Sequence, residues 1–386
     1  MSTAAPETVR AGTGAPRRRL AFVVSSVHGG GAEAVGVAWA TWFADQGHQV
    51  AVVVVSDRPT GDVLPPRVTV HRLGGIRSHL KKVSALARLI DSEGFDALVG
   101  LQTYPNLLAI AARERARHRP GLVVTEHNLI SLGLPGAPPA HRAKIALARR
   151  WYRRADVVTS ASHPVAAEMN AAFGIPASRS LVVPNPAMAK VRERTPVPRV
   201  PGTAAGVQLV LACRLVPQKN PELALSVAEE LVRRGIPTEV VSFGGGPLLA
   251  QMTAEAERRG VAFTSHGWVE DWISHFGPTS VVLLPSHREG LGNVLIEAAA
   301  RGVPSVAIST ALGVADAIIP GVTGELAASA DPAAVADAVQ EAAGLEVGGI
   351  DDWLDRFGAD ASATLLEKAV TRAVVRSGSA VGEPRA

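Results

Sequence analysis

Apolar, β-branched segments alternate with segments of helical periodicity along almost the whole chain, and this alternation limits the possible folds more than any other feature. In the first half the strand candidates are residues 20–25, 49–56, 68–73, 96–101, 122–126, 156–160 and 181–184. The helix candidates between them are residues 32–46, 79–92, 106–117, 141–154 and 164–173. Strands that alternate with helices are typical of βαβ units, so the sequence predicts an α/β fold with parallel sheets.

The alternation stops at 185–206, a segment rich in proline and basic residues, and then starts again. The later strand candidates are 208–212, 238–243, 261–265, 280–284 and 305–308, and the helix candidates are 221–234, 248–259 and 293–301. A length of 386 residues fits two domains, each with its own core. We therefore expect two Rossmann-like domains that face each other across a cleft, with ligands at the carboxyl ends of the strands.

These patterns divide the chain into six predicted parts. They are a disordered tail at 1–18, a first Rossmann-like domain at 19–190, a linker at 191–206, a second Rossmann-like domain at 207–360, a helix at 361–376 that crosses back toward the first domain, and a tail at 377–386.

The composition favours a cytoplasmic protein. The single cysteine, Cys213, cannot form an intrachain disulfide, so nothing calls for an oxidising compartment. The apolar run at 20–25 is too short for a secretory leader or a membrane span, and we interpret it as a buried first strand.

Charge is divided unevenly between the two halves. Residues 1–200 carry a net charge of +13 and the remainder −9, which predicts an anionic surface or substrate on the first half. The basic stretch 141–155 has two interpretations: a solvated basic face, which we favour, or peripheral contact with anionic lipid at the inner face of the membrane. Neither interpretation includes nucleic acid as a partner.

A glycine-rich loop follows the first strand candidate and precedes the first helix. Gly29, Gly31 and Ala34 fit the pattern G-x-G-x-x-A, and Asp57 ends the next strand, so dinucleotide binding by an NAD(P)-dependent oxidoreductase is one hypothesis. This pattern alone is a weak signal. The same glycines would let the backbone approach a different ligand.

The segment 286–306 contains two glutamates, Glu289 and Glu297, with seven residues between them across a predicted junction of loop and helix. Gly290 and Gly292 keep the loop thin, and Asn293 can begin the helix. The expected anion site consists of the backbone N–H groups of Leu291, Gly292, Asn293 and Val294. The glutamates can accept hydrogen bonds from sugar and ribose hydroxyls. Two surface charges are the alternative.

Two cations follow the first strand candidate of the second half. Arg214 lies at the carboxyl end of that strand, and Lys219 lies just before the next helix. This placement suits a diphosphate, although two solvated charges are equally compatible with it. No Asp-x-Asp pair occurs in the sequence. We therefore expect no metal ligands, no cofactor, and charge stabilisation by the two cations instead.

Together these segments resemble the family 4 retaining glycosyltransferases of the GT-B fold. The resemblance covers nearly the whole chain. Besides the first loop and the Glu-x7-Glu segment, it rests on T-E-H-N at 125–128, V-P-N-P at 183–186, C-R-L-V-P-Q-K-N at 213–220, G-G-G-P at 244–247 and G-W-V-E-D at 267–271. Three departures are Gly245 where the family often has Asp, Cys213 where it commonly has Gly, and Leu291 in place of a frequent Phe.

The resemblance implies a role for each matching residue. Arg214 and Lys219 would hold the donor diphosphate, Glu289 the transferred sugar and Glu297 the ribose, while His127 would lie beside the donor sugar. Gly31 would also contact the donor, and the residues on the acceptor side would be His28, Glu126 and Asn128.

The implied activity is metal-independent, retaining transfer of a hexose or N-acetylhexosamine from a nucleotide sugar to a hydroxyl of an unidentified acceptor. Family usage favours a UDP-sugar over GDP-mannose. The alanine- and arginine-rich composition indicates a bacterium, in which an envelope glycoconjugate or a glycosylated secondary metabolite are plausible products. A non-catalytic nucleotide-sugar-binding protein of the same fold is an alternative, and the oxidoreductase hypothesis is weaker, since it explains only the first loop.

Overall fold

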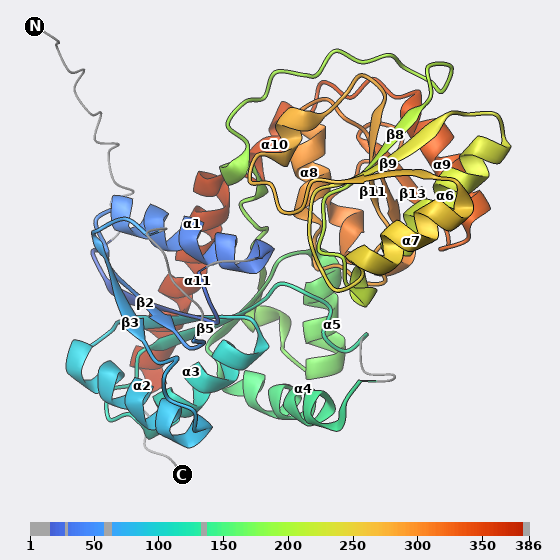
Figure 1. Cartoon of the computed structure of the whole chain (residues 1–386). Helices are drawn as coiled ribbons and strands as arrows, with labels where there is room; N and C mark the ends of the chain where they lie inside the picture. The colour runs from blue at the N-terminus through green and yellow to red at the C-terminus, as the bar shows by residue number, and fades with distance from the viewer. Residues whose placement is uncertain (1–15, 28–29, 58–63, 133–136, 381–386) are drawn as a thin grey trace, which may run out of the picture. The chain divides into compact units, whose positions relative to one another are not determined.

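The computed structural model describes residues 16–27, 30–57, 64–132 and 137–380 (Figure 1). The chain divides into two compact units, the first formed by residues 1–123 and 370–386 and the second by residues 124–369. The boundary between the units falls inside a strand of the first sheet, so the units do not coincide with the two sheets. The domain limits given above therefore stay a prediction.

The first sheet has seven strands in the order β3-β2-β1-β4-β5-β6-β7. The bounds are β1 Arg19–Val24, β2 Gln49–Val54, β3 Val68–Arg72, β4 Ala97–Leu101, β5 Gly121–Glu126, β6 Val157–Ser160 and β7 Ser180–Val182. The pairs of β1 with β2 and β4, of β2 with β3, and of β6 with β7 are parallel. The strands β4, β5 and β6 are buried at every position, which agrees with a sheet covered on both faces.

Helices of the first unit cover the strands β1 to β4. Their bounds are α1 Gly31–Asp45, α2 His79–Glu93 and α3 Thr103–Arg115. Figure 1 shows α2 and α3 side by side, with α1 on the other side of the blue strands. The helices α4 Pro139–Trp151 and α5 His163–Phe173 precede and follow β6 in the second unit.

The last helix, α11 Ala359–Ala380, returns to the first sheet as expected. A Cβ atom on Gly121 would lie 2.7 Å from the backbone of Ala373, so glycine at the start of β5 permits this close approach. Arg18 Nη1 donates to Thr371 Oγ1 at 2.7 Å. The C-terminal part of the helix is therefore integral to the first unit.

The second sheet has six strands in the order β10-β9-β8-β11-β12-β13, and all of its neighbouring pairs are parallel. The bounds are β8 Val207–Leu211, β9 Thr238–Ser242, β10 Ala262–Ser265, β11 Ser280–Leu284, β12 Ser305–Ile308 and β13 Gly324–Ala327. Two parallel α/β sheets confirm the predicted fold class.

Two apolar clusters lie on the two faces of the second sheet. The helices α6 Glu222–Arg233, α7 Leu249–Arg259 and α9 Pro332–Ala343 supply one cluster. The other contains residues of α8 Asn293–Ala299 and α10 Asp351–Asp355. Figure 1 shows the two groups of helices on opposite sides of the strands. The sequence patterns missed β13, α9 and α10, and most other predicted ends lie within one or two residues of the observed ones.

The predicted linker, residues 191–206, lies within the second unit and is hydrogen-bonded to other segments of it. Val197 N donates to the carbonyl of Arg301, Val200 N to that of Pro278, and Gly202 N to that of Ala343. Proline has no backbone N–H group, so this segment cannot join a sheet or helix over its length. It follows an extended path that a few single hydrogen bonds hold in place.

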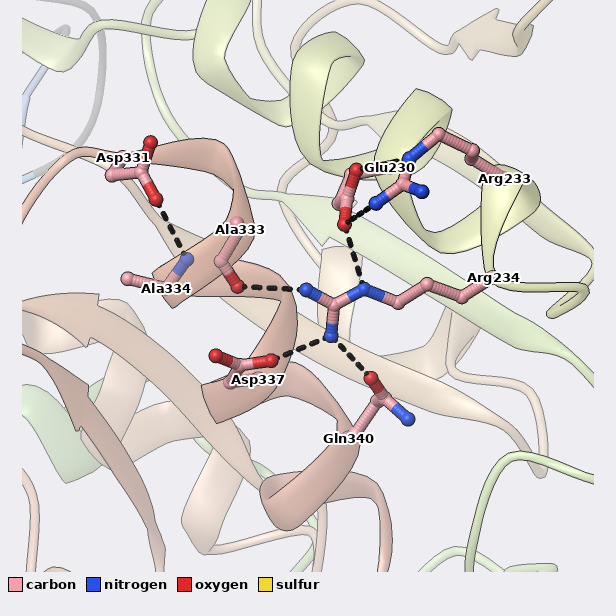
Figure 2. A network of polar contacts seen from close by, with 8 residues as sticks. All are labelled: Glu230, Arg233, Arg234, Asp331, Ala333, Ala334, Asp337 and Gln340. Carbon is pink, nitrogen blue, oxygen red and sulfur yellow. Dashed lines mark hydrogen bonds and ion pairs between the residues drawn. The ribbon is translucent and has the colours of Figure 1, made fainter.

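One polar network joins α6 to α9 on the outer side of the second sheet (Figure 2). Arg234 donates to Glu230 Oε1 at 2.8 Å, to Asp337 Oδ1 at 2.6 Å and to Gln340 Oε1 at 2.6 Å. Hydrogen bonds from Arg233 and then Arg234 lower the pKa of Glu230 to about 2. Arg234 therefore adds a polar link between two helices that also pack through apolar side chains.

We expect the Arg234→Met variant to unfold roughly 2–4 °C below the wild type in calorimetry at pH 7, because the link from α6 to α9 is lost. Arg233→Met is the matched control: that side chain is 71% exposed and pairs only within α6, so its effect should be smaller. Glu230 has a lowered pKa, so its contribution to stability is present above pH 4.5 and is lost as the pH falls toward 2. The difference between wild type and Arg234→Met should therefore narrow over that interval. Equal unfolding temperatures for both variants at pH 7 would contradict this role.

Candidate donor site

The candidate site lies where two neighbouring strands of the second sheet end. Parallel strands place their carboxyl ends at one edge, and β8 and β11 are paired with each other. The loops that follow them are also joined, since His287 N donates to the carbonyl of Gln218 at 3.0 Å. Sheet topology therefore brings the two predicted motifs together, although they lie about 70 residues apart in the sequence.

Lys219 and Glu289 form an ion pair between these loops. Lys219 Nζ lies 2.5 Å from Glu289 Oε1, and Ser286 Oγ donates to the same oxygen at 2.6 Å. The Glu289 side chain is only 9% exposed, and the charge of Lys219 offsets the cost of burying its carboxylate. Both of these contacts fall on Oε1. The other carboxylate oxygen, Oε2, can accept from a ligand hydroxyl.

The other predicted cation and its neighbour differ in exposure. Arg214 is exposed, which suits a side chain that meets an anionic ligand from solvent. Cys213 is buried, and burial raises the pKa of its thiol to about 11. The thiol is therefore protonated at neutral pH and packs as a small apolar group in the position where the resembled family commonly has glycine.

Glycines let the loop before α8 pack against two other segments. A Cβ atom on Gly290 would lie 1.9 Å from the carbonyl oxygen of His127, and one on Gly313 would lie 2.3 Å from that of Glu289. Gly292 has φ of +88°, a left-handed conformation that other residues rarely adopt. The thin loop predicted from the sequence thus places the T-E-H-N segment directly against the Glu-x7-Glu segment.

The loop G-G-G-P explains one departure from the resembled family. Cβ atoms on Gly244 and Gly246 would collide with the carbonyl oxygens of Cys213 and Leu215, at 2.0 and 2.3 Å. A Cβ atom on Gly245 would meet no atom within 4 Å. The departure therefore falls on the one glycine of the three that has room for a side chain, while packing requires the other two.

Glu297 is a buried carboxylate on α8. Burial raises its pKa, opposed by the nearby charge of Lys190 and by a hydrogen bond from Trp272. Trp272 Nε1 donates to Glu297 Oε2 at 2.9 Å. Trp272, which directly follows the motif G-W-V-E-D, was not predicted as a site residue, and the one signal for it in the sequence was that a buried glutamate needs a donor.

His127 is the centre of a neutral polar chain. Its Nδ1 lies 2.8 Å from Asn185 Oδ1 and its Nε2 lies 3.0 Å from Thr125 Oγ1. Asn185 Nδ2 donates to Asn293 Oδ1 at 3.0 Å. Burial lowers the pKa of His127 to about 4, so the imidazole is neutral at pH 7. Asn185 and Thr125 were not predicted as site residues, although both belong to motifs that the resemblance uses.

The other residues predicted to contact the donor or the acceptor are Glu126, Asn128, Gly31 and His28. The buried Glu126 carboxylate accepts a hydrogen bond from Tyr152, and Asn128 Oδ1 accepts from the backbone of Leu129, so both side chains also stabilise the chain locally. Gly31 begins α1 in the first unit, and His28 lies outside the described residues. Their predicted roles stay predictions.

The predicted anion site is at the start of a short helix. Leu291 is buried in the apolar core, Gly292 is the N-cap residue and α8 has only seven residues. A helix of this length has a weak macrodipole, so any anion would be held mainly by the individual N–H groups. Within the described residues no group of three or more His, Cys, Asp and Glu side chains could hold a metal ion.

Comparison with known families agrees with this geometry. Residues 29–187 match the family model described as Glycosyltransferase Family 4. Residues 206–344 match the model described as Glycosyl transferases group 1. The chain belongs to the family 4 glycosyltransferases.

Curated relatives of this family member are similar over part of their length. The chain is 31% identical over 245 residues to a GDP-mannose-dependent alpha-(1-6)-phosphatidylinositol monomannoside mannosyltransferase of Mycolicibacterium smegmatis, a match that covers 55% of this chain and 62% of that protein. It is 30% identical over 223 residues to a D-inositol 3-phosphate glycosyltransferase of Geodermatophilus obscurus, with 53% and 49% covered. The matches thus span about half the length of these relatives.

Solved structures share the fold over nearly the whole chain. The apo lipopolysaccharide outer core galactosyltransferase WaaB has a TM-score of 0.68 at 18% identity, covering 92% of this chain and 99% of that chain. Anabaena Alr3699/HepE in complex with UDP-glucose has a TM-score of 0.64 at 18% identity, covering 95% and 98%. Structural similarity at this level of sequence identity establishes the fold of the chain, which is GT-B.

Replacing Gly290 with alanine should destabilise the candidate donor site, because the new Cβ atom would displace the carbonyl group of His127. We expect a lower unfolding temperature and faster amide hydrogen exchange in both 125–128 and 286–293. Gly245→Ala is the matched control, since its Cβ atom has open space and φ is not positive there. If both variants behave like the wild type in exchange mass spectrometry, the close contact between the two segments does not exist in solution.

Proposed function

We propose that this chain is a retaining glycosyltransferase that moves a sugar from a nucleotide diphosphate sugar to an acceptor hydroxyl without a metal ion. The observation that carries the proposal is the Lys219–Glu289 ion pair at the adjoining ends of β8 and β11, in a member of family 4. The pair provides a charge for phosphate and a carboxylate for sugar hydroxyls within one contact.

The ion pair is compatible with donor binding because lysine has three hydrogen-bond donors. Lys219 can keep its contact with Glu289 and donate to a diphosphate oxygen at the same time. Arg214, exposed at the end of β8, supplies the second charge. Glu289 Oε2 would accept from the sugar and Glu297 from the ribose, while loop N–H groups from Leu291 to Val294 would donate to phosphate.

The state of His127 supports a reaction that uses no protein base. A general base needs a free nitrogen and a pKa near the working pH. Both nitrogens of His127 have partners, and its pKa lies at about 4. In the proposed reaction a phosphate oxygen of the departing diphosphate takes the acceptor proton, the acceptor attacks on the face that the diphosphate leaves, and the anomeric configuration is retained.

The choice of nucleotide is a finer part of the proposal. We propose a UDP-sugar, which agrees with the bound UDP-glucose named for Anabaena Alr3699/HepE. The name of the Mycolicibacterium smegmatis relative specifies GDP-mannose instead, and this is the competing choice. The proposed acceptor is a compound that offers a free hydroxyl group.

A thermal-shift panel of UDP-, GDP-, TDP- and ADP-sugars, each with EDTA or Mg²⁺, tests the donor site. We expect a UDP-sugar to raise the unfolding temperature by several degrees equally in EDTA and Mg²⁺. The shift should disappear in Lys219→Met and persist in Arg258→Met, a control on α7. If only GDP-mannose stabilises the protein, the proposed donor is GDP-mannose and not a UDP-sugar. Stabilisation that requires Mg²⁺ would contradict the proposal of a metal-independent donor site.

An assay with a labelled nucleotide sugar distinguishes a transferase from a non-catalytic nucleotide-sugar-binding protein and from an oxidoreductase. Transfer to added hydroxyl compounds, or slow donor hydrolysis, should fall roughly 100-fold or more in Glu289→Gln if the carboxylate acts in the transition state. Donor binding with neither reaction would support the alternative of a non-catalytic nucleotide-sugar-binding protein. Stabilisation by NAD(P)(H) and by no nucleotide sugar would favour the oxidoreductase hypothesis.

The basic helix α4 allows a test of whether the protein binds to an anionic membrane surface. Ile145 and Ala148 are buried, and Leu147 is 38% exposed. Arg142, Arg149 and Arg150 are exposed, so any lipid contact would be mainly electrostatic. Arg142, Ile145 and Arg149 also line a hollow on this helix. No helix within the described residues is long and apolar enough to span a membrane.

If α4 binds anionic lipid, the protein should sediment with phosphatidylglycerol vesicles at low salt and be released at high salt, because surface charge interactions are screened. The double variant Arg142→Gln/Arg149→Gln should lose this binding, and Arg258→Gln should keep it. Absence of sedimentation at low salt would leave α4 as a solvated basic face, which is the simpler interpretation.

A further inference from the structure

We propose that Asn185 is a positioning residue that holds the His127 imidazole in its Nδ1–H tautomer and ties it to Asn293 at the first turn of α8. The inference rests on the proposed function for its catalytic meaning, but its structural content can be tested without any donor. Asn185 belongs to the motif V-P-N-P at 183–186.

The direction of each hydrogen bond follows from the chemistry of the amide. Asn185 Nδ2 donates to Asn293 Oδ1 at 3.0 Å, so the oxygen of Asn185 is the atom that faces His127. A carbonyl oxygen can only accept, and it lies 2.8 Å from Nδ1, which must therefore carry the hydrogen. In the neutral ring Nε2 is then an acceptor, and Thr125 Oγ1 at 3.0 Å donates to it.

The surroundings of His127 keep this tautomer neutral. The residue is half-buried, and desolvation of the ring lowers its pKa to about 4, although the hydrogen bond to Asn185 acts to raise it. Two glutamates lie in the segments around His127: Glu126 accepts a hydrogen bond from Tyr152, and Glu289 accepts from Lys219 and Ser286. An amide partner for Nδ1 also supplies no negative charge that would favour protonation, in contrast to a carboxylate partner.

The chain of hydrogen bonds connects three motifs that are distant in sequence. His127 follows β5, Asn185 follows β7 and Asn293 begins α8. The carbonyl of His127 also lies against Gly290 in the loop before α8. Asn185 thus sets the position of the imidazole relative to the loop proposed to bind the donor, and a displaced imidazole would no longer meet the transferred sugar in the productive geometry.

The test is ¹⁵N NMR of the histidine side chains in the donor-free full chain, with His127→Asn used to assign the signal. The wild type should show a neutral Nδ1–H ring from pH 5.5 to 8. His163 is a matched comparison, because its Nδ1 lies 2.8 Å from a carboxylate, Asp316 Oδ2, and its signal should be the same in all Asn185 variants. An Nε2–H ring or an imidazolium at pH 7 in the wild type would overturn the proposal.

Two variants distinguish positioning from simple loss of stability. Asn185→Asp keeps an acceptor for Nδ1–H but adds a charge, so the Nδ1–H ring should persist and the pKa of His127 should rise toward neutrality. Asn185→Ala removes the acceptor, and the single tautomer should be lost. If His127 titrates as in the wild type in both folded variants, Asn185 does not control it.

Kinetics give an independent measurement once a donor is known. Asn185→Ala should lower kcat by about 10- to 100-fold with a much smaller change in the KM for the donor, because the donor contacts remain. In Asn185→Asp the kcat should fall as the pH is lowered, whereas the kcat of the wild type should not. An unchanged kcat in both variants would contradict the positioning role, whereas absence of transfer in the wild type would count against the proposed function and leave the NMR result valid.

Discussion

The contact between Lys219 and Glu289 is the interaction on which the candidate site depends. A carboxylate that is 9% exposed is costly to bury, and an ammonium group at 2.5 Å together with the Ser286 hydroxyl offsets this cost. The pairing is possible only because β8 and β11 are neighbours, so that the loops after them meet at one edge of the sheet. Sheet order thus determines which charges can act together, and removal of either partner would leave a poorly solvated charge at the site.

Glycines supply the second constraint, since the loops around the pair approach one another at the distance of backbone contact. Gly244, Gly246, Gly290 and Gly313 each face a carbonyl oxygen that a Cβ atom would reach within about 2.3 Å or less. Gly245 faces open space. These four glycines let neighbouring loops approach each other. The chemistry of the site is therefore assembled from segments with very little room between them.

Much of this arrangement could be predicted from the sequence, because it depends on periodicity and on local motifs. Strand and helix patterns predicted both sheets, and the family resemblance implied that Lys219 and Glu289 belong to one donor site. The patterns missed β13 and α9: β13 has only four residues, and α9 consists largely of alanine, whose small side chains give little contrast between an apolar and a polar face. Partners such as Trp272 for Glu297 and Asn185 for His127 were also missed, since they are set by tertiary contacts between residues 25 and 58 positions apart.

The site combines a charged part with a neutral part, and this division suits the proposed reaction. Cleavage of a glycosyl–phosphate bond leaves negative charge on the diphosphate and develops positive charge on the sugar ring. Lys219 and Arg214 would stabilise the first charge. An imidazolium beside the sugar would repel the second, whereas a neutral His127 held by Asn185 and Thr125 would not. Burial lowers the pKa of His127 to about 4 and outweighs the hydrogen bond to Asn185, which acts to raise it. Burial therefore favours the transition state at neutral pH, while the hydrogen bonds to Asn185 and Thr125 fix the ring in place.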